Sequence, residues 1–256
     1  MSRETTDTWS RLRASAIVLA CAAFIPSGLA MAADLEDESL EARIQQKLVK
    51  KELDGVTVRV EGGIATLSGA VESLRQKDVA ARVAHGVEGV VDVQNDARVL
   101  WGGRTSEEIA TDVSRALRDP SFHTLFDWVE ASVEGRSVIL TGWVTMPWKI
   151  DAAQRRMERI AGVDVVEAKI EVLPVSIFDD QIRVQAARRL YGSLAFFDRA
   201  QSLAPPVHIV VRRGEVILLG EVRNEAERML ARSLVSSAAL PLRIVNNLRW
   251  PGDGRS

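Results

Sequence analysis

The chain has 256 residues, of which 46% are hydrophobic and 27% are charged, and its 33 basic and 35 acidic side chains nearly balance. These proportions are typical of globular protein, and they exclude a wholly disordered chain, a collagen-like chain and a multi-span membrane chain. The formal charge of −2 provides no net field that would attract nucleic acid. The single cysteine, Cys21, excludes an internal disulfide, so packing must stabilise the fold.

Residues 1–32 have the order of a secretory signal peptide. Three arginines precede an apolar run over residues 14–25, and the small-residue pattern Ala30-Met31-Ala32 follows. A basic end, a short apolar stretch and an Ala-x-Ala site are the parts of a signal that is removed on export. We therefore predict cleavage after Ala32.

Two alternatives to this cleavage remain open. Val18-Leu19-Ala20-Cys21 loosely matches a lipoprotein processing site, which would leave Cys21 lipidated and the protein tethered to a membrane. Residues 14–33 are just long enough as a helix to form an uncleaved anchor, although Pro26 and Gly28 weaken it.

The most specific pattern in the chain is a repeat. The motif Leu-x-Gly-x-Val occurs at residues 67–71, 140–144 and 218–222, at intervals of 73 and 78 residues. Self-similarity at a nearly fixed interval indicates tandem copies of one small unit. The motif glycines, and the glycines twenty residues later in the first two copies, are predicted to be structural: Gly69, Gly142, Gly220, Gly89 and Gly162.

Each copy is predicted to begin with a helix followed by two strands. The helices lie near residues 39–51, 106–118 and 179–191, and Thr105 and Glu108 have capping-box spacing at the second start. Turns that contain glycine join the two strands. Alternation predicts half-buried strands in copies one and three, at Val56, Val58 and Val60, and at Val207, Ile209 and Val211.

A second helix and a last strand complete each copy. Ser73 and Asn224 are good helix starts in copies one and three. In copy two Thr145 is available as a cap, and an apolar stripe along one helix face is formed by Ile150, Ala153, Met157 and Ile160. The last strands are predicted over residues 90–99, 163–173 and 242–250.

The resulting element order is α-β-β-α-β in every copy. A strand, helix, strand connection favours a right-handed crossover and places the helices on one face of the sheet. We therefore predict an α+β fold of three tandem modules, each a small three-stranded mixed sheet with two helices on one face. The modules cover residues 36–100, 104–174 and 177–250, between the signal segment 1–32 and a tail of residues 251–256.

The element order, the Leu-x-Gly-x-Val strand end and a last strand with Asn95 or Asn246-Asn247 resemble the BON module, named for bacterial OsmY and nodulation proteins. The resemblance covers residues 36–250 and is weaker in copy three, where Leu240-Pro241 replaces the second glycine. It implies structural glycines and core positions, and no catalytic group. It also implies a protein exported to the periplasm, sometimes under osmotic or envelope stress, whose modules bind phospholipid surfaces.

The three copies differ most in their aromatic residues. Copy one has none between residues 33 and 100, whereas copies two and three contain longer segments before the motif glycine, with Phe122, Leu125 and Phe126 in one and Phe196 and Phe197 in the other. These side chains either enlarge small cores or form an apolar surface for lipid or a partner. In copy two, Trp143, Met146 and Trp148 crowd a turn that should be polar. The candidate contact residues are Trp143, Met146, Trp148, Phe196 and Phe197.

Motifs for catalysis, cofactors and metals are absent from the sequence. It contains no Walker loop, no Gly-x-Gly-x-x-Gly, no zinc motif and no Gly-x-Ser-x-Gly. The histidines, His85, His123 and His208, lie one in each copy without ligand spacing, which favours solvated or core positions. Gly86-Val87-Glu88-Gly89 has the spacing of an RNA-binding Gly-x-x-Gly loop, but its acid and the export signal argue against nucleic acid.

These observations favour a non-enzymatic, exported envelope protein whose modules bind phospholipid membrane surfaces or envelope partners, without a cofactor. A periplasmic chaperone-like protein that binds unfolded clients is the main alternative, and an enzyme with an unrecognised site is a third hypothesis. The sequence does not determine the oligomeric state.

Overall fold

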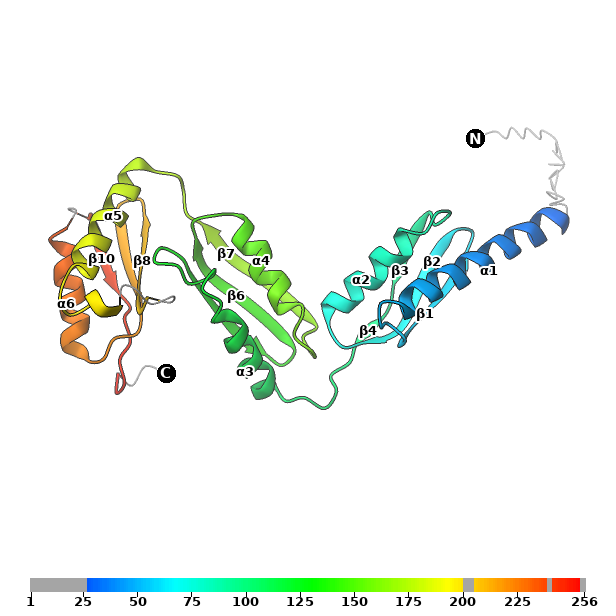
Figure 1. The fold of residues 1–256 in the computed structure, drawn as a ribbon, viewed down its shortest axis with the longest axis horizontal. Helices are drawn as coiled ribbons and strands as arrows, with labels where there is room; N and C mark the ends of the chain where they lie inside the picture. The colour runs from blue at the N-terminus through cyan, green and yellow to red at the C-terminus, as the bar shows by residue number, and fades with distance from the viewer. Residues whose placement is uncertain (1–26, 200–204, 239–240, 254–256) are drawn as a thin grey trace, which may run out of the picture.

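The structure is a computed structural model that describes residues 27–199, 205–238 and 241–253. Cys21 and most of the predicted signal and anchor segments lie outside these residues. The described part of the chain repeats the order α-β-β-α-β three times, as predicted, and the three modules follow one another in an extended row (Figure 1).

Module 1 contains α1 (Ser27–Val49), β1 (Val56–Glu61), β2 (Ile64–Val71), α2 (Leu74–His85), β3 (Asp92–Asn95) and β4 (Arg98–Val99). Module 2 contains α3 (Ser106–Leu117), β5 (Trp128–Glu134), β6 (Ser137–Val144), α4 (Trp148–Met157) and β7 (Val165–Val172). Module 3 contains α5 (Ile177–Tyr191), the short 3-10 helix η1 (Phe197–Arg199), β8 (Val207–Arg212), β9 (Glu215–Gly220), α6 (Glu225–Ser236) and β10 (Arg243–Asn246).

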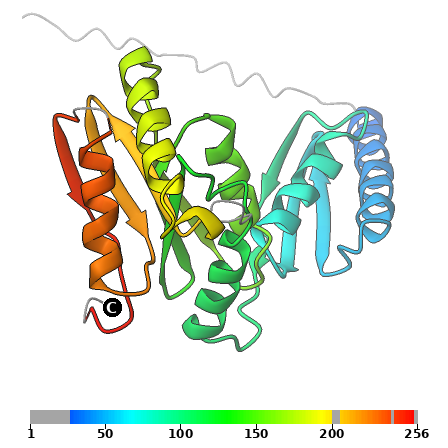
Figure 2. The same cartoon turned by 60° about the vertical axis from the view of Figure 1, so that its left-hand side comes forward.

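The second strand is central in every sheet. In module 2, β6 pairs antiparallel with β5 and parallel with β7. Module 3 has the same arrangement around β9, and in module 1 the short β4 extends the pairing of β3 along β2. Figure 2 shows both helices of module 3 on the same side of its strands. The mixed sheets with helices on one face confirm the predicted α+β class.

Side-chain caps begin most of the short helices. Thr105 forms the predicted capping box at α3, and Ser73 and Asn224 accept backbone hydrogen bonds at the starts of α2 and α6. α4 differs, since no side chain caps its first turn. The expectation that Thr145 caps this helix is wrong, because its hydroxyl and its backbone amide both donate to the carboxylate of Asp127.

The motif glycines lie where the central strand passes very close to the first strand of the hairpin. Gly142 has φ of +128°, and a Cβ atom on it would be 2.0 Å from the carbonyl oxygen of Trp128. Gly69 and Gly220 have φ of +106° and +111°. A Cβ atom on either of them would likewise lie 2.2 Å from a backbone carbonyl oxygen. Only glycine fits at these points without a shift of the backbone.

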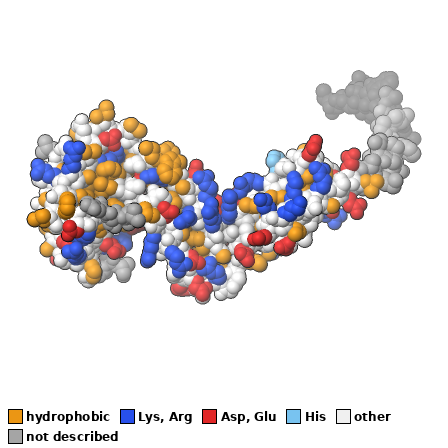
Figure 3. Space-filling view, in the orientation of Figure 1, with side chains coloured by type: hydrophobic (Ala, Val, Ile, Leu, Met, Phe, Trp, Pro, Cys, Tyr) orange, Lys and Arg blue, Asp and Glu red, His pale blue; other side chains and the backbone are white. Residues whose placement is uncertain are grey.

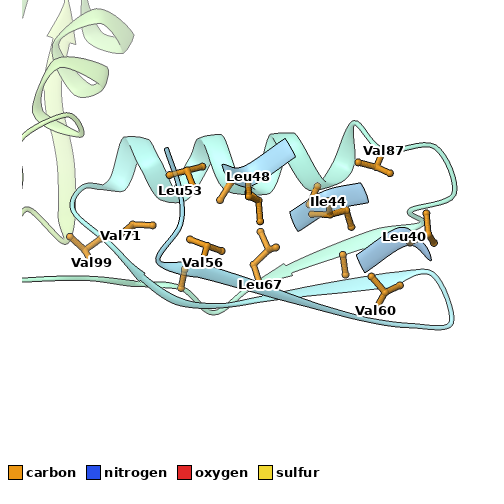
Figure 4. Close-up of a cluster of buried hydrophobic side chains, with 14 residues drawn as sticks. Leu40, Ile44, Leu48, Leu53, Val56, Val60, Leu67, Val71, Val87 and Val99 are labelled. Carbon is orange, nitrogen blue, oxygen red and sulfur yellow. The ribbon is translucent and has the colours of Figure 1, made fainter. Parts of the chain in front are cut away.

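The core of module 1 lies between its sheet and its two helices (Figure 4). Leu40, Ile44 and Leu48 recur every four residues along α1 and are buried in one cluster with Val56 and Leu67. α1 starts well before the predicted helix at residue 39, yet among residues 35–49 the first buried side chain is that of Leu40. The described core therefore begins beyond the predicted cleavage point.

Module 3 departs from the predicted half-buried strands. All residues from Val207 to Val211 in β8 and from Val216 to Gly220 in β9 are buried. One face of these strands carries the core of the module, and the other packs against the sheet of module 2. The prediction was wrong for this copy because a neighbouring sheet covers the face that would otherwise meet water. The cluster at this contact contains Leu173, Trp128 and Trp143 of module 2, with Val210, Ile217 and Leu219 of module 3.

Candidate functional site

One of the residues predicted to contact a membrane or partner, Trp143, lies between modules 2 and 3. Its side chain is partly buried against the sheet of module 3, and the Arg212 guanidinium lies 5.8 Å from the centre of its ring. Its apolar contacts are therefore with the neighbouring module. Part of the side chain stays exposed, so contact of Trp143 with a membrane or an external partner remains a prediction. A single copy in the sequence does not reveal that two sheets face each other.

The residues added to copy two belong to the same contact. Leu125 and Phe126 pack against the core of module 3, whereas Phe122 is buried in the core of module 2. The backbone amide of Ile209 in β8 donates to the carbonyl oxygen of Leu125 at 2.8 Å. The longer segment thus both enlarges one core and holds the next module.

Two of the three histidines meet at this contact. The ring centroids of His123 and His208 are 5.7 Å apart, and the ring of Trp128 lies 4.8 Å from that of His208. Burial lowers the pKa of His123, and it lowers the pKa of His208 to about 4. Both rings are therefore neutral at pH 7 and form part of the packing. Among residues 27–199, 205–238 and 241–253, no group of histidine, cysteine, aspartate and glutamate is arranged to hold a metal ion.

A buried carboxylate fixes the turn between β6 and α4. Asp127 is completely buried, and it accepts hydrogen bonds from the Thr145 amide at 2.6 Å, the Thr145 hydroxyl at 2.8 Å, the Thr124 hydroxyl and the Lys149 ammonium group. Burial opposes ionisation of Asp127, but these hydrogen bonds outweigh it and hold the pKa of the carboxyl below its ordinary value. The charged pair thus anchors the turn from beneath, in place of a helix cap.

The anchored turn directs two predicted contact residues toward solvent. Met146 is 52% exposed and Trp148 is 55% exposed, although both are large apolar side chains. Lys149 lies below them, with its ammonium group 5.8 Å from the centre of the Trp148 ring. Because Asp127 neutralises Lys149, the outer face of the turn is apolar.

The linker between modules 2 and 3 and the first turn of α5 extend this apolar surface. The amide of Leu173 donates to the carbonyl oxygen of Val144 at 2.8 Å, which holds the start of the linker beside the turn. Val175, Ile177 and Phe178 follow, and they are 99%, 79% and 52% exposed. Figure 3 shows hydrophobic side chains gathered over the start of α5, the linker and the adjoining end of module 2. We call this surface the apolar crest, and it consists of Met146, Trp148, Val175, Ile177 and Phe178.

The structure separates the last two predicted contact residues. Phe196 has no exposed surface and is one of the largest side chains in the core of module 3. Its prediction as a surface contact was therefore wrong, because the added segment of copy three folds back over the core. Phe197 is 53% exposed on η1, at the opposite end of α5 from the crest.

The prediction missed the contribution of the linker. Pro174 separates β7 from Val175, and Ile177 and Phe178 directly precede the acids at the start of α5. A run of apolar residues between a strand end and a polar helix start is a local signal for an exposed apolar segment. It was missed because apolar residues also recur along β7 and α5, so the exposed residues between them resemble the core positions of these elements.

Within the described part of the chain, no helix combines the length and apolar character needed to cross a membrane. The crest is instead a surface patch on an otherwise folded pair of modules. Large exposed apolar side chains in one patch, with an indole among them, are typical of surfaces that contact lipid or a partner.

Comparison with family models agrees with the repeated fold. A family model for the BON domain matches residues 36–100, 105–174 and 181–252. The chain is similar to the C-terminal domain of CdsD, a structural protein of the type III secretion system of Chlamydia trachomatis, with 13% identity, a TM-score of 0.23, and coverage of 83% of this chain and 97% of that chain. A second structure of CdsD gives 14% identity and a TM-score of 0.23, with coverage of 84% and 95%. Comparison with curated proteins gives no match.

Proposed function

The chain belongs to the BON domain family, whose domains are binding modules, and on this premise we propose that it is an exported envelope protein that binds phospholipid membrane surfaces through the apolar crest. The observation that carries this proposal is the exposure of five large apolar side chains on one anchored surface. Water-exposed apolar groups gain free energy when they enter the acyl boundary of a bilayer. Trp148 suits this position, since an indole ring favours the headgroup level.

Rigid support of the crest strengthens the proposal. The turn that carries Met146 and Trp148 is held by Asp127 from below, and the linker is bonded to the end of β6. A surface that is already ordered loses little conformational entropy on binding. The crest can therefore bind lipid without folding first.

Export is the second part of the proposal, and it is supported by the predicted signal over residues 1–32. The mass of the processed N-terminus is the test, because cleavage after Ala32 leaves a chain that starts at Ala33, whereas lipoprotein processing leaves an acylated Cys21. The family resemblance also suggests a role under osmotic or envelope stress. Growth of a deletion strain in high-osmolarity medium tests that role.

Co-sedimentation with phospholipid vesicles tests the membrane contact. We expect the wild-type protein to pellet with vesicles and the double variant Met146→Ser, Trp148→Ser to pellet much less. Phe197→Ser is the matched control, since Phe197 is equally exposed but lies outside the crest. The N-terminal segment is identical in all three proteins, so a difference between them reports on the crest. Equal pelleting of all three would contradict the proposal.

The exposed crest also suits a chaperone-like protein that shields unfolded clients. The two functions differ in one measurement. A protein that fails to pellet with vesicles but suppresses the aggregation of an unfolded client would have the chaperone function, and the membrane proposal would be wrong.

A further inference from the structure

The outward face of α4 carries both the crest and positive charge. Trp148 and Arg155 are seven residues apart, so they lie along one side of α4, and Arg159 lies in the turn that directly follows the helix. Ala153 and Met157 are buried on the opposite side. Arg155 and Arg159 are exposed, and within the described residues neither forms an ion pair.

The junction of modules 1 and 2 places α2 directly after the end of α4. The amide of Arg75 donates to the carbonyl oxygen of Glu158 at 2.8 Å. The amide of Gly162 donates to the carbonyl oxygen of Glu72 at 3.0 Å. Figure 1 shows the start of α2 beside the end of α4. Two helices from different modules thus follow one another along the same side of the protein.

The outward face of α2 continues the positive charge. Arg75 and Arg82 are seven residues apart and lie opposite the buried Ala80 and Ala84. Both arginines form ion pairs with the carboxylate of Asp78. The guanidinium of Arg75 lies 3.7 Å from this carboxylate, and that of Arg82 lies 2.7 Å from it. One negative charge between two arginines leaves positive charge on this face.

The charge of this pair of helices differs from that of the whole chain. α4 and α2 hold six basic and two acidic residues, although the whole chain has a formal charge of −2. The helices of module 3, α5 and α6, hold five basic and four acidic residues. Figure 3 shows basic side chains in a run along the face that leads from module 2 to module 1. The basic surface is therefore local, and it adjoins the crest.

We propose that Arg155 of α4 and Arg159 in the turn after it, with Arg75 and Arg82 of α2, form an arginine row that binds the phosphate groups of an anionic phospholipid bilayer, so that modules 1 and 2 lie along the membrane beside the inserted crest. This inference rests on the proposed function and adds the orientation of the protein and its selectivity for anionic lipid. Guanidinium groups form paired hydrogen bonds with phosphate oxygens. A bilayer surface with negative charge attracts arginines within a Debye length.

Vesicles of two compositions test the arginine row. One set is phosphatidylcholine alone, and the other contains phosphatidylglycerol as well. Each arginine near an anionic surface strengthens binding about fivefold, so the double variant Arg155→Gln, Arg159→Gln should bind the anionic vesicles roughly tenfold to thirtyfold more weakly. Its binding to neutral vesicles should not change, because that binding depends on the crest.

The matched control is Arg188→Gln, Arg189→Gln, which removes two exposed arginines from α5 that form no ion pair within the described part of the chain. This variant should bind both kinds of vesicle as the wild type does. All four changed residues are exposed, and thermal melting followed by circular dichroism verifies that each variant is folded.

Three results are informative. Selective loss of anionic binding in the α4 variant supports the arginine row. Unchanged anionic binding in that variant, or an equal loss in the α5 control, overturns the row and leaves the proposed function intact. Failure of the wild type to bind either vesicle overturns both.

Discussion

The Nδ1 atom of His208 in module 3 lies 2.8 Å from the backbone carbonyl oxygen of Thr124 in module 2. The next residue, Ile209, donates its amide to Leu125 of the same loop at 2.8 Å. These two hydrogen bonds and the apolar contact between the sheets join modules 2 and 3. Because the crest includes residues from both modules, this contact also determines how the crest is held together.

The contact between modules 2 and 3 should weaken at acid pH. His208 has a pKa of about 4 in the folded protein and an ordinary value of 6.5, so the unfolded chain binds a proton that the folded chain excludes. The free energy of unfolding should therefore be greatest above pH 6.5 and fall by about 3 kcal/mol as the pH falls from 6.5 to 4. His123, Asp127 and Glu130 face the same region and affect this titration. Urea unfolding at a series of pH values measures it.

A glutamine at position 208 provides the control for this pH effect. His208→Gln keeps a side-chain amide that can donate to Thr124 but removes the titrating group. The variant should lose much less stability than the wild type over the same range of pH. An equal loss in both proteins would show that His208 does not cause the acid sensitivity.

Removal of the buried carboxylate should strongly destabilise module 2. Asp127→Asn leaves the Lys149 ammonium group buried without its counterion, and the loss of one partner of a buried pair costs about 3–5 kcal/mol. Chemical denaturation measures the loss. Glu61→Gln is the comparison, because it breaks the exposed pair with Arg59 and should have little effect. Similar small effects of both changes would mean that Asp127 does not anchor the turn.

Phe126 should couple the unfolding of modules 2 and 3. Its side chain is partly buried against the core of module 3, so Phe126→Ala should cost about 2 kcal/mol and separate the melting of the two modules. Differential scanning calorimetry detects the separation as a second transition. Phe197→Ala removes a more exposed ring and should leave the melting profile unchanged. If the two variants behave alike, the added loop does not hold the modules together.

The glycines of the repeat differ in their tolerance of a side chain. Gly142→Ala forces a Cβ atom to within 2.0 Å of the Trp128 carbonyl oxygen, whereas the Cβ of Gly135→Ala meets no atom within 4 Å. Both glycines have positive φ, so the difference between the variants measures the close approach of the two strands. We expect the free energy of unfolding to fall by about 1 kcal/mol in Gly135→Ala and by about 3 kcal/mol or more in Gly142→Ala. Equal costs would contradict the structural role of the repeat.

Much of the fold could be predicted from the sequence because its signals are local. The spacing of the Leu-x-Gly-x-Val motif identifies the repeat, and the cap at Thr105 and the stripe from Ile150 to Ile160 depend only on residues that are close together in the sequence. The BON family and the element order followed from these signals. The early start of α1 could not be predicted from the apolar stripe, because that stripe begins at Leu40.

The parts that the sequence could not predict depend on contacts between segments that lie far apart in the chain. Trp143 looks like a surface residue within its own copy, and only the position of Leu219 on the facing sheet explains its burial. Phe196 likewise required knowledge of how the added segment folds back. Met146 and Trp148 could be identified because a polar turn was expected there. Ile177 could not, because it belongs to the crest only through the hydrogen bond between Leu173 and Val144, which holds the linker beside this turn.

The most direct test of membrane contact uses an environment-sensitive fluorophore at position 177, in the variant Cys21→Ser, Ile177→Cys. The same label on Leu194→Cys in the Cys21→Ser background is the control, because Leu194 is 96% exposed and lies at the other end of α5. With phosphatidylglycerol-containing vesicles, emission from position 177 should shift to the blue as the label enters the acyl region, and emission from position 194 should not. Vesicle binding without a shift at position 177, or with equal shifts at both positions, would contradict the account.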